Sequence, residues 1–577
     1  MLNRETEAGE PVWIYPKKDE DWKQKIIKEF KIHPVTAQIL VSRGFTTIKD
    51  IHDYLYAKLP DLFDPFLFKQ MSKAVARVIQ SIENNEGIII YGDNDVDGMT
   101  GTALLVDFLR LVGANVFSFV STPGIVRENL IVEAIEYGTQ NGCKLLITVD
   151  CGVTSAEEIA QVVKSGIDVI VTDHHEPTDA IPNCVATLNP KLNKQSYPNR
   201  DLTGVGVAFK LAHAITNTLV DSKKISPRKV DLKRYLDLVA LGTISDMGAL
   251  KDENRILVRY GIKQLRKSKR IGLAKLLEVA DVDPNQITTY TVASKIAPRL
   301  NSLGRIADPQ KGVELLLLRN AAQAEKMALE LDLNNIERQK IERTMSADIE
   351  EMIQKNPEIL KEKAIVMHSD KWHPGVIAIL STRISKMHQR PTVMIAIEGG
   401  VGKGSLRSIS KFPLIPALKK SADILINFGG HDFAAGMTIK KENIELFKSK
   451  FIEHANHTLN DMDVMAKLHL DAEVDFEDLT FELMESIKLF EPFGNENLQP
   501  VLYTQAKQAW PPKVVGNHLK LYLVQGDRML EGIAPWKAAM SRKLRQPYNL
   551  KIAFSPQVNP QGPSIQLMIR ELQIIGK

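Results

Sequence analysis

Three acidic motifs, each placed directly after a short aliphatic run, constrain this chain of 577 residues more than any other feature. The motifs are GDNDVDG at residues 92–98, TVDCG at 148–152 and TDHH at 172–175. The runs before them are rich in Ile, Val and Leu and predict buried strands of a parallel sheet, with helices between the strands. Ligands of open α/β sheets bind beyond the carboxyl ends of the strands, so we expect the three motifs to meet at one edge.

The first two motifs carry carboxylates suited to metal binding. Asp93, Asp95 and Asp97 stand at alternate positions, and a strand end or tight loop sends alternate side chains the same way. Asp150, one residue after its predicted strand, adds an oxygen ligand that can bridge two ions. Such a cluster of like charges is costly unless cations neutralise it. We therefore expect divalent cations at this edge of the sheet.

The third motif adds two imidazoles. His174 and His175 directly follow Asp173, and a mixed shell of imidazole and carboxylate suits Mn²⁺ or Mg²⁺. Asp246, after an apolar helix predicted over 235–241, is a further candidate ligand, with helix capping as its alternative role. Two metals roughly 3.5–4 Å apart bind the oxygens of a phosphodiester, activate a water and stabilise the departing oxyanion. The motifs together predict phosphodiester hydrolysis.

The composition of the chain bounds its class. The length allows three or four domains, and 44% hydrophobic with 25% charged residues is ordinary for a globular protein. No apolar run approaches the roughly 18 residues that span a bilayer, and the N-terminal segment lacks the apolar core of a signal peptide. The three cysteines have no CxxC spacing, so we expect them to be reduced. These features predict a cytoplasmic protein with no membrane partner.

The C-terminal part of the chain is basic. Residues 501–577 hold eleven Lys or Arg against three Asp or Glu, whereas the whole chain has a formal net charge of only +4. Short alternating runs between Pro and Gly predict an all-β module here. In residues 518–523 the leucines point one way and His518, Lys520 and Tyr522 the other. A face that mixes cations with rings suits a nucleic-acid strand. We expect the same nucleic-acid-binding face to include Trp510, Trp536, Tyr548, Arg542, Lys543 and Arg545. The alternative is an ordinary barrel with half-exposed aromatic side chains.

The order of these patterns divides the chain into five predicted segments. They are a helical cap (1–80), a parallel-sheet domain (81–250), a helical connector (251–362), a second α/β domain (363–460) and the all-β module (461–577). Within the connector, Pro309 and Pro357 bracket a stretch with a single glycine, Gly312. If wholly helical it would be about 70 Å long, at roughly 1.5 Å per residue. Such a stretch predicts a spacer helix.

The predicted second α/β domain contains two glycine-rich segments, 402–408 and 428–431, which we expect to be loops. Glycines let a backbone approach phosphate, and Arg makes bidentate contacts with an oxyanion. The candidate strand-holding residues of this domain are His373, Arg383, Ser405, Arg407, Ser408, Gly429, Gly430 and His431. The connector adds Arg299, Asn301 and Arg305, with helix capping as the alternative role of Arg305.

In the order of its motifs the chain resembles the DHH phosphoesterase superfamily and, within it, the exonucleases specific for single strands. GDNDVDG, TVDCG, VTDHH and ISDM resemble the four motifs of the catalytic domain. WHPGVIAILSTRI, GKGSLRS and FGGHDFAAG resemble the DHH-associated substrate-binding domain, and PFGNENLQPVL resembles the start of an OB-fold. The resemblance implies an α/β multidomain fold with a DHH-type parallel sheet, a long linking helix, a DHH-associated domain and a C-terminal OB-fold β-barrel.

The resemblance also implies an activity: 5′-to-3′ removal of mononucleotides from single-stranded DNA in recombination and repair, with two Mn²⁺ or Mg²⁺ ions. By motif position it assigns the metals to Asp93, Asp95, Asp97, Asp150, His174 and Asp246. His175 would contact the scissile phosphate, and Asp173 would orient the histidines. Polarity rests on the resemblance alone, as do a single-strand-binding protein and a helicase as candidate partners.

The sequence departs from the family pattern at two places. Asn94 stands where an aromatic residue is common, at a position that is not a ligand. Residues 121–129 replace a stretch of arginine and aromatic residues before a Gly-Tyr-Gly turn, so we expect contacts with the strand to differ there. Two alternatives stay open. One is a DHH phosphodiesterase for short oligonucleotides or cyclic dinucleotides, which has no need of the last hundred residues. The other is a DNA-binding scaffold that has lost its metals.

Overall fold

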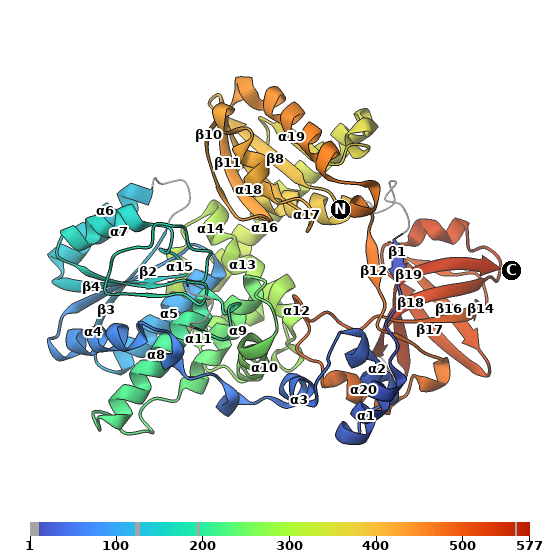
Figure 1. Ribbon diagram of the computed structural model, residues 1–577, viewed down its shortest axis with the longest axis horizontal. Helices are drawn as coiled ribbons and strands as arrows, with labels where there is room; N and C mark the ends of the chain where they lie inside the picture. Colours follow the sequence, from blue (N-terminus) through green and yellow to red (C-terminus); the bar gives the residue numbers. More distant parts are fainter. Residues whose placement is uncertain (1–10, 122–126, 193–196, 560–561, 577) are drawn as a thin grey trace. The chain divides into compact units, whose positions relative to one another are not determined.

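The computed structural model of the chain describes residues 11–121, 127–192, 197–559 and 562–576 (Figure 1). Contacts divide the chain into two compact units. Unit 1 comprises Met1–Leu55, Gln339–Phe490 and Gln499–Lys577, and unit 2 comprises Tyr56–Arg338 and Glu491–Leu498. Among the described residues, no helix has the length and apolar character needed to cross a membrane. The five predicted segments stay a prediction.

Unit 2 is built on a five-stranded sheet in the order β3-β2-β4-β5-β6. Its strands are β2 (Gly87–Gly92), β3 (Asn115–Val120), β4 (Cys143–Val149), β5 (Asp168–Thr172) and β6 (Ala186–Leu188). All four pairings are parallel, and the aliphatic runs of β2, β4 and β5 are almost fully buried. The predicted parallel sheet is therefore confirmed, and the three motif-bearing strands are neighbours in it.

Helices cover both faces of this sheet. Ile88 and Ile90 of β2 belong to the large core shared with α4 (Met71–Glu83), α5 (Val96–Leu111) and α8 (Gly204–Asp221), whereas Ile89 packs with α7 (Ala156–Lys164). This alternation follows from the period of two in a strand. The other helices of unit 2 are α6 (Arg127–Gln140), α9 (Leu236–Ser245), α10 (Asp252–Leu265), α11 (Ile271–Val279), α12 (Thr289–Thr291), α13 (Ala297–Asn301), α14 (Leu303–Ile306) and α15 (Gln310–Leu317).

The predicted spacer is not one continuous helix. Helix α15 ends at Leu317, Leu318 is extended, and α16 (Ala321–Lys355) begins after Asn320. The side chain of Asn320 accepts a hydrogen bond from the backbone N–H of Gln323 at 3.0 Å, which caps the new helix. The 35 residues of α16 span about 52 Å at 1.5 Å per residue, and the length of about 70 Å for a wholly helical stretch does not apply. The boundary between the two units falls inside α16.

The middle part of unit 1 contains a five-stranded sheet in the order β10-β11-β9-β8-β7. Its strands are β7 (Ile365–Ser369), β8 (Thr392–Glu398), β9 (Val401–Arg407), β10 (Leu425–Gly430) and β11 (Ala434–Lys440). Helices α17 (Ile377–His388), α18 (Leu414–Lys419) and α19 (Ile444–Thr458) pack on it. Only β7 and β8 pair in parallel.

The two glycine-rich segments of this domain are strands, so the prediction of loops is wrong. Gly402 and Gly404 lie inside β9, where a Cβ atom would stand 2.7 Å from Ile395 Cγ2 and from Met437 Cγ, respectively. These two glycines make room for side chains packed within the sheet. Gly429 lies in β10 and has open space around it, with no heavy atom within 4 Å of a built Cβ.

The C-terminal part of unit 1 is a β-barrel. Its strands are β13 (Ala472–Glu473), β14 (Leu502–Gln508), β15 (Lys513–Val515), β16 (His518–Gln525), β17 (Arg528–Ala534), β18 (Asn549–Val558) and β19 (Ile565–Gly576). They follow the order β13-β14-β18-β19-β17-β16-β15, and an additional pairing of β14 with β16 closes a ring of five strands. A closed barrel of five strands is the architecture of an OB-fold.

Trp13, near the start of the described residues, packs against Tyr503 and Ala553 of this barrel. Strand β1 (Val12–Ile14) pairs in parallel with β12 (Lys467–His469). Helices α1 (Glu20–Phe30), α2 (Pro34–Ser42) and α3 (Ile48–Tyr56) follow, and α20 (Phe481–Lys488) packs against α2. Arg43 forms an ion pair with Asp471 at 3.0 Å. The predicted helical cap therefore also contains a strand.

Candidate metal centre

Asp93, Asp150 and Asp173 each directly follow a strand, and the three strands β2, β4 and β5 are neighbours in the sheet. The backbone N–H of Asp93 donates to Val149 at 3.1 Å and that of Asp150 donates to Thr172 at 2.9 Å. The N–H of Asp173 donates to Leu188 at 3.0 Å. These bonds continue the ladder of the parallel sheet one residue past each strand, so the register of the sheet sets the spacing of the three carboxylates.

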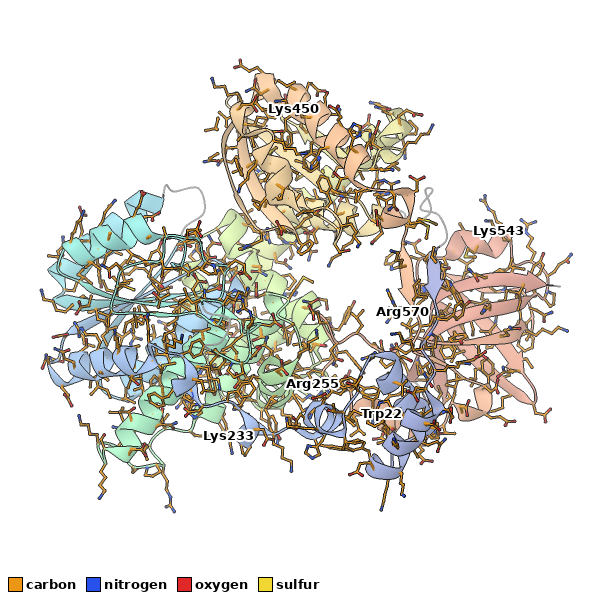
Figure 2. All side chains as sticks on the ribbon, in the orientation of Figure 1. Trp22, Lys233, Arg255, Lys450, Lys543 and Arg570 are labelled. Atoms are coloured by element: carbon orange, nitrogen blue, oxygen red, sulfur yellow. The ribbon has the colours of Figure 1, made fainter. Side chains whose placement is uncertain are left out.

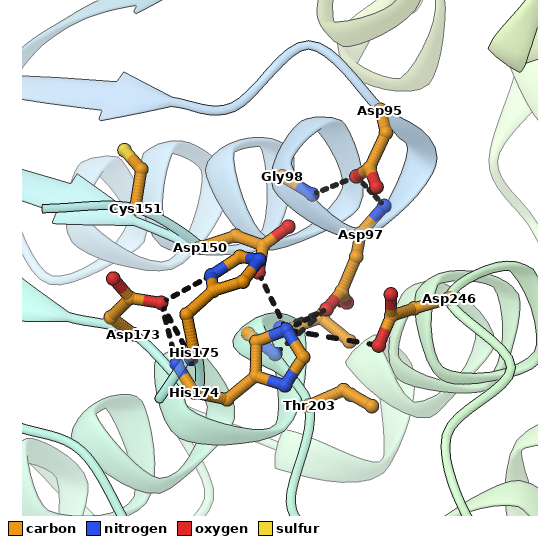
Figure 3. A network of polar contacts seen from close by, with 12 residues as sticks. Asp95, Asp97, Gly98, Asp150, Cys151, Asp173, His174, His175, Thr203 and Asp246 are labelled. Atoms are coloured by element: carbon orange, nitrogen blue, oxygen red, sulfur yellow. Dashed lines mark hydrogen bonds and ion pairs between the residues drawn. The ribbon is translucent and has the colours of Figure 1, made fainter. Parts of the chain in front are cut away.

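The predicted metal-binding side chains converge at this edge, and Figure 3 shows Asp95, Asp97, Asp150, His174 and Asp246 there. Their ligand atoms form three groups, each with all atoms within 4.8 Å of one another. The groups are Asp93 with Asp95 and Asp150; Asp97 with His174 and Asp246; and Asp150 with His174 and His175. Asp150 and His174 each belong to two groups, which is the position expected of a side chain between two ions.

Distances place His174 among three carboxylates. Its Nε2 atom lies 3.0 Å from Asp150 Oδ1, 3.7 Å from Asp246 Oδ2 and 3.9 Å from Asp97 Oδ2. Asp97 and Asp150 are almost fully buried, whereas the Asp246 side chain is 28% exposed. The centre is therefore open on the side of Asp246.

Two aspartates of the first motif also hold the backbone in place. Asp95 is the N-cap of α5 and accepts hydrogen bonds from the N–H groups of Asp97 at 2.9 Å and Gly98 at 3.1 Å. Asp97 accepts from the N–H groups of Gly204 at 2.7 Å and Val205 at 3.0 Å, the first residues of α8. A helix N-terminus carries partial positive charge, so it stabilises this buried carboxylate.

Electrostatics of the cluster indicate a site made for cations. Burial and the neighbouring carboxylates raise the pKa of Asp97 and of Asp150 well above the usual range. The same causes raise the pKa of Asp246 to about 7. Like charges in a dry site oppose ionisation, and bound divalent cations reverse this effect. The donor set of carboxylate oxygens and one imidazole fits Mn²⁺ or Mg²⁺.

His175 and Asp173 form a separate pair beside the cluster. His175 Nδ1 lies 2.8 Å from Asp173 Oδ1. Burial disfavours the charged ring of His175, but the hydrogen bond and charge of Asp173 outweigh burial and raise the pKa of His175 to about 9. The Asp173 carboxylate also accepts from the N–H groups of Val153, His174 and His175. Asp173 therefore fixes both the imidazole and the loop that carries it.

Three residues at the centre make contacts that the sequence did not indicate. Ser121 Oγ donates to Asp93 Oδ1 at 3.0 Å. Asn301, predicted to hold the strand, accepts from the N–H of Val96 at 3.2 Å and donates to Ser245 Oγ at 3.1 Å. It therefore joins the first motif to the residue before Asp246. The third residue is Gly204. The sequence pattern that could have indicated it is the Gly-Val-Gly run at the start of an apolar helix.

The other predicted strand-holding residues of the connector lie in unit 2. The guanidinium of Arg299 pairs with Asp332 at 2.8 Å and donates to the carbonyl of Lys295. Arg305 lies in the short helix α14. Most of the segment 121–129 lies outside the described residues, so the prediction of altered contacts there stays a prediction.

The predicted strand-holding residues of the second α/β domain lie in unit 1, with Ser405 and Arg407 on β9, Gly429 and Gly430 on β10, and Arg383 on α17. Arg407 donates to the carbonyl of Leu406 at 2.8 Å, and burial lowers its pKa. Ser405 is buried and lies 3.4 Å from the Arg407 guanidinium. Arg383 pairs with Glu342 of α16. The remaining predicted residues of this domain are His373, Ser408 and His431.

The residues predicted for an aromatic and basic face lie in the barrel, and the role of that face stays a prediction. Leu519, Leu521 and Leu523 of β16 are fully buried, which confirms the predicted alternation. Trp510 is 43% exposed, and its ring centroid lies 5.3 Å from that of Tyr522. Lys520 lies 2.6 Å from Glu531 across the strand pair, so its charge is partly neutralised. The basic residues Arg542, Lys543 and Arg545 lie between β17 and β18, and Figure 2 labels Lys543.

Family models match three parts of the chain. The N-terminal domain of the DHH family matches residues 87–243, the DHHA1 domain matches 361–457 and the RecJ OB domain matches 470–571. The first of these matches contains Asp93, Asp150 and the two histidines. The sheet and its acidic edge therefore define a DHH phosphoesterase.

Relatives and solved structures narrow the class. The chain is 34% identical to the single-stranded-DNA-specific exonuclease RecJ of Bacillus subtilis, over 98% of this chain and 71% of the relative. It is 32% identical to RecJ of Escherichia coli, over 87% and 89% of the two chains. The crystal structure of Thermus thermophilus RecJ with Mn²⁺ superposes with a TM-score of 0.81 at 27% identity, covering 97% of this chain and 79% of that one. The chain belongs to the RecJ family.

Proposed function

We propose that this protein is a metal-dependent 5′-to-3′ exonuclease that degrades single-stranded DNA to mononucleotides in recombination and repair. The observation that carries the proposal is the convergence of five aspartates and two histidines from four separate motifs at one edge of the sheet. The relatives named as exonucleases specific for single-stranded DNA support the substrate. The direction of degradation rests on family membership.

The ligand set fits two divalent cations, Mn²⁺ or Mg²⁺. Asp93 and Asp95 would hold one ion and Asp97, His174 and Asp246 the other, with Asp150 between them. Bound there, such ions supply charge for the phosphodiester oxygens and lower the pKa of a bound water. A solved RecJ relative with Mg²⁺ superposes with a TM-score of 0.75 at 26% identity, so both metals are represented among structures of this fold.

The chain's own residues have distinct tasks in this proposal. His175, held by Asp173 and open to solvent for 40% of its side chain, would donate a hydrogen bond to a non-bridging oxygen of the scissile phosphate. Asp97 keeps the first motif attached to α8 while the reaction proceeds. Arg305, Arg407 and His431 are proposed to hold the strand, and Trp510 and Tyr522 to stack on its bases.

Two features argue against the other candidate functions. A phosphodiesterase for cyclic dinucleotides or short oligonucleotides has no need of a barrel with an exposed Trp510 beside Tyr522. A scaffold without metals would have no reason to retain Asp97 and Asp150 in a buried cluster that opposes their ionisation. We also propose a cytoplasmic location, supported by three free cysteines, and a single-strand-binding protein and a helicase as partners.

The experiment that tests the hydrolytic part compares single-stranded and duplex DNA with Mn²⁺ present. The wild type is expected to degrade the single strand and spare the duplex. Asp95→Ala is expected to be inactive because it removes both a ligand and the cap of α5. Asp221→Asn is the matched control, since Asp221 is an exposed acid at the end of α8 in the same unit. Equal activity of Asp95→Ala and the wild type would contradict the proposal.

Binding by the barrel needs its own test. Trp510→Ala is expected to weaken the binding of a long single strand by about 1–3 kcal/mol, the usual contribution of one stacked base. Hydrolysis of a short oligonucleotide, which need not reach the barrel, is expected to change little. Phe481→Ala is the control, because Phe481 is a half-exposed ring on α20 of the same unit. A similar loss on both substrates would argue against a strand-binding role of the barrel.

A further inference from the structure

Unit 2 contains a cavity that the metal centre does not use. It has a volume of about 540 Å³ and lies between the end of α5, the turn before α9, and the helices α10, α11 and α15. A neighbouring cavity of about 500 Å³ shares Asp107, Arg234, Leu317 and Arg319 with it. Pockets for small molecules commonly have volumes of about 300–1,000 Å³. The space is therefore large enough for a nucleotide.

Positive charge dominates the walls. The two cavities are lined by six cationic residues against three acidic ones. The cations are Arg110, Arg234, Lys267, Lys269, Arg270 and Arg319, and the acids are Asp107, Asp231 and Asp237. Lys267 and Lys269 are exposed, and neither ammonium group forms an ion pair within the described part of the chain. Three positive charges in excess predict an anionic ligand.

Two arginines of the cavity are held in fixed positions. The guanidinium carbons of Arg234 and Arg270 lie 5.4 Å and 5.5 Å from the ring centroid of the buried Tyr235. Arg270 Nε lies 3.2 Å from Asp237, so Asp237 orients this side chain. The buried Nη2 atom of Arg270 donates no hydrogen bond to the described residues, and Asp107 Oδ2 is 3.8 Å away. A guanidinium held in a fixed position suits the recognition of a phosphate oxygen.

Another part of the wall is apolar. Ile271 and the leucines 316–318 line the cavity beside the charged residues. A free phosphate ion would leave this wall without a contact, whereas a ligand with a planar apolar part would cover it. The charged and the apolar parts of the wall together therefore suit a nucleotide, with its phosphate near the arginines and its base on the leucines.

The cavity is distinct from the metal centre. Asp95 and Asp97 stand at the first residues of α5, and Asp107 stands near its end. Ten residues of helix separate Asp97 from Asp107, which is about 15 Å at 1.5 Å per residue. Helix α9 packs against α5 and also connects the two places, with Asp237 in its first turn and Asp246 at its C-cap. Figure 2 labels Lys233, in the same turn as Arg234.

We propose that this cavity binds a free nucleotide through its phosphate, at a site separate from the metal centre. The phosphate is bound by Arg270, Lys267 and Lys269, and the base packs on the leucines. The ligand class is a nucleoside 5′-phosphate. The inference does not depend on the activity proposed above, because binding is measured without metal or DNA.

The test is a titration of the full-length protein with dAMP in the presence of a chelator, which weakens binding at the metal centre. Saturable binding is expected with dAMP and not with adenosine or inorganic phosphate alone. Lys267→Glu combined with Lys269→Glu is expected to weaken it roughly tenfold or more, since hydrogen bonds to charged groups contribute about 1.5–3 kcal/mol each. Both lysines are exposed, so the double variant is expected to fold.

The matched control combines Lys144→Glu with Lys164→Glu. These lysines are exposed on the same unit and do not line the cavity. The control is expected to bind dAMP like the wild type. The proposal would be overturned by the absence of saturable dAMP binding, by unchanged binding in the Lys267 and Lys269 variant, or by an equal loss in the control. Binding of inorganic phosphate as tightly as dAMP would also overturn it.

Discussion

The carboxylate of Asp97 accepts hydrogen bonds from the first turn of α8, at 2.7 Å from the N–H of Gly204. This contact joins two segments that are 107 residues apart in the chain. A Cβ atom on Gly204 would stand 2.5 Å from Asp150 Oδ1, inside the cluster itself. The N-terminus of α8 therefore supports one aspartate and leaves room for another.

Replacing Gly204 with alanine is expected to damage the metal centre directly. The added methyl group would push against Asp150, and either that carboxylate or the start of α8 must move. We expect Gly204→Ala to lower Mn²⁺ affinity and nuclease activity by roughly 10–100-fold, the usual effect of disturbing the support of a ligand. Calorimetric titration with Mn²⁺ measures the affinity.

Gly206→Ala is the control for that change. Gly206 lies about one half-turn further along α8, and its added methyl group would meet the side chain of Leu202 rather than a ligand. Some loss of stability is expected, with Mn²⁺ affinity kept. If both variants lose the metal equally, the close approach to Asp150 is not the cause.

Neutralising one carboxylate is expected to stabilise the metal-free protein. The carboxylates around Asp150 repel one another in a buried site and raise its pKa. Asp150→Asn should therefore raise the melting temperature in a chelator. It should also remove most of the stabilisation against unfolding that bound Mn²⁺ gives the wild type. For the wild type, this increase in the free energy of unfolding is about 2.7 kcal/mol at a metal concentration 100 times the Kd.

Thermal unfolding with and without Mn²⁺ measures both effects of Asp150→Asn. The Asp221→Asn variant should behave like the wild type in both conditions, because its side chain is exposed and outside the cluster. A lower melting temperature of Asp150→Asn in the chelator would contradict the account of mutual repulsion.

Asp173 is expected to act through His175. Asp173→Asn keeps the size of the side chain but loses the charge that holds the imidazole, so we expect activity to fall roughly 10–100-fold. Metal affinity should fall less, since Asp173 lies outside all three ligand groups. Asp168→Asn, on the same strand β5 with a half-exposed side chain, is the control and should stay active. Equal rates of hydrolysis for Asp173→Asn and the wild type would contradict the proposed role of His175 at the scissile phosphate.

Much of the centre could be predicted from the sequence because it depends on local order. An aliphatic run followed by an acid places each of Asp93, Asp150 and Asp173 at a strand end, and the parallel register then brings them together. The role of Asn301 could not be read in this way. Its two hydrogen bonds cross 205 and 56 residues and depend on how α13 packs.

Other features that the sequence did not reveal have the same physical origin. Glycines in 402–408 predicted a loop, but in β9 they relieve crowding from Ile395 and Met437, which only the packed sheet reveals. The pairing of β1 with β12 joins residues about 455 apart and leaves no local pattern. It also bears on experiment design. Removal of the chain from about Leu468 onward would take away the partners of β1 and of Arg43, so point variants test the barrel better.

The stability of unit 1 is expected to depend on pH through His388. Burial, with a smaller effect of Arg390, lowers the pKa of His388 to about 4, from an ordinary value of 6.5. The unfolded chain therefore binds the proton first, and stability falls as the pH drops from 6.5 toward 4. His388→Gln cannot take up this proton, so its melting temperature should fall by a few degrees less than that of the wild type between pH 7 and pH 4.5. An identical decline in both proteins would contradict the assignment.

The most direct test of the central claim follows the products from single strands labelled at either end, with Mn²⁺ and purified protein. We predict that the 5′ label appears as a mononucleotide from the earliest times, while the 3′-labelled strand shortens gradually. Asp95→Ala should release neither. Early release of a 3′-labelled mononucleotide, or fragments cut from the middle of the strand, would contradict the account.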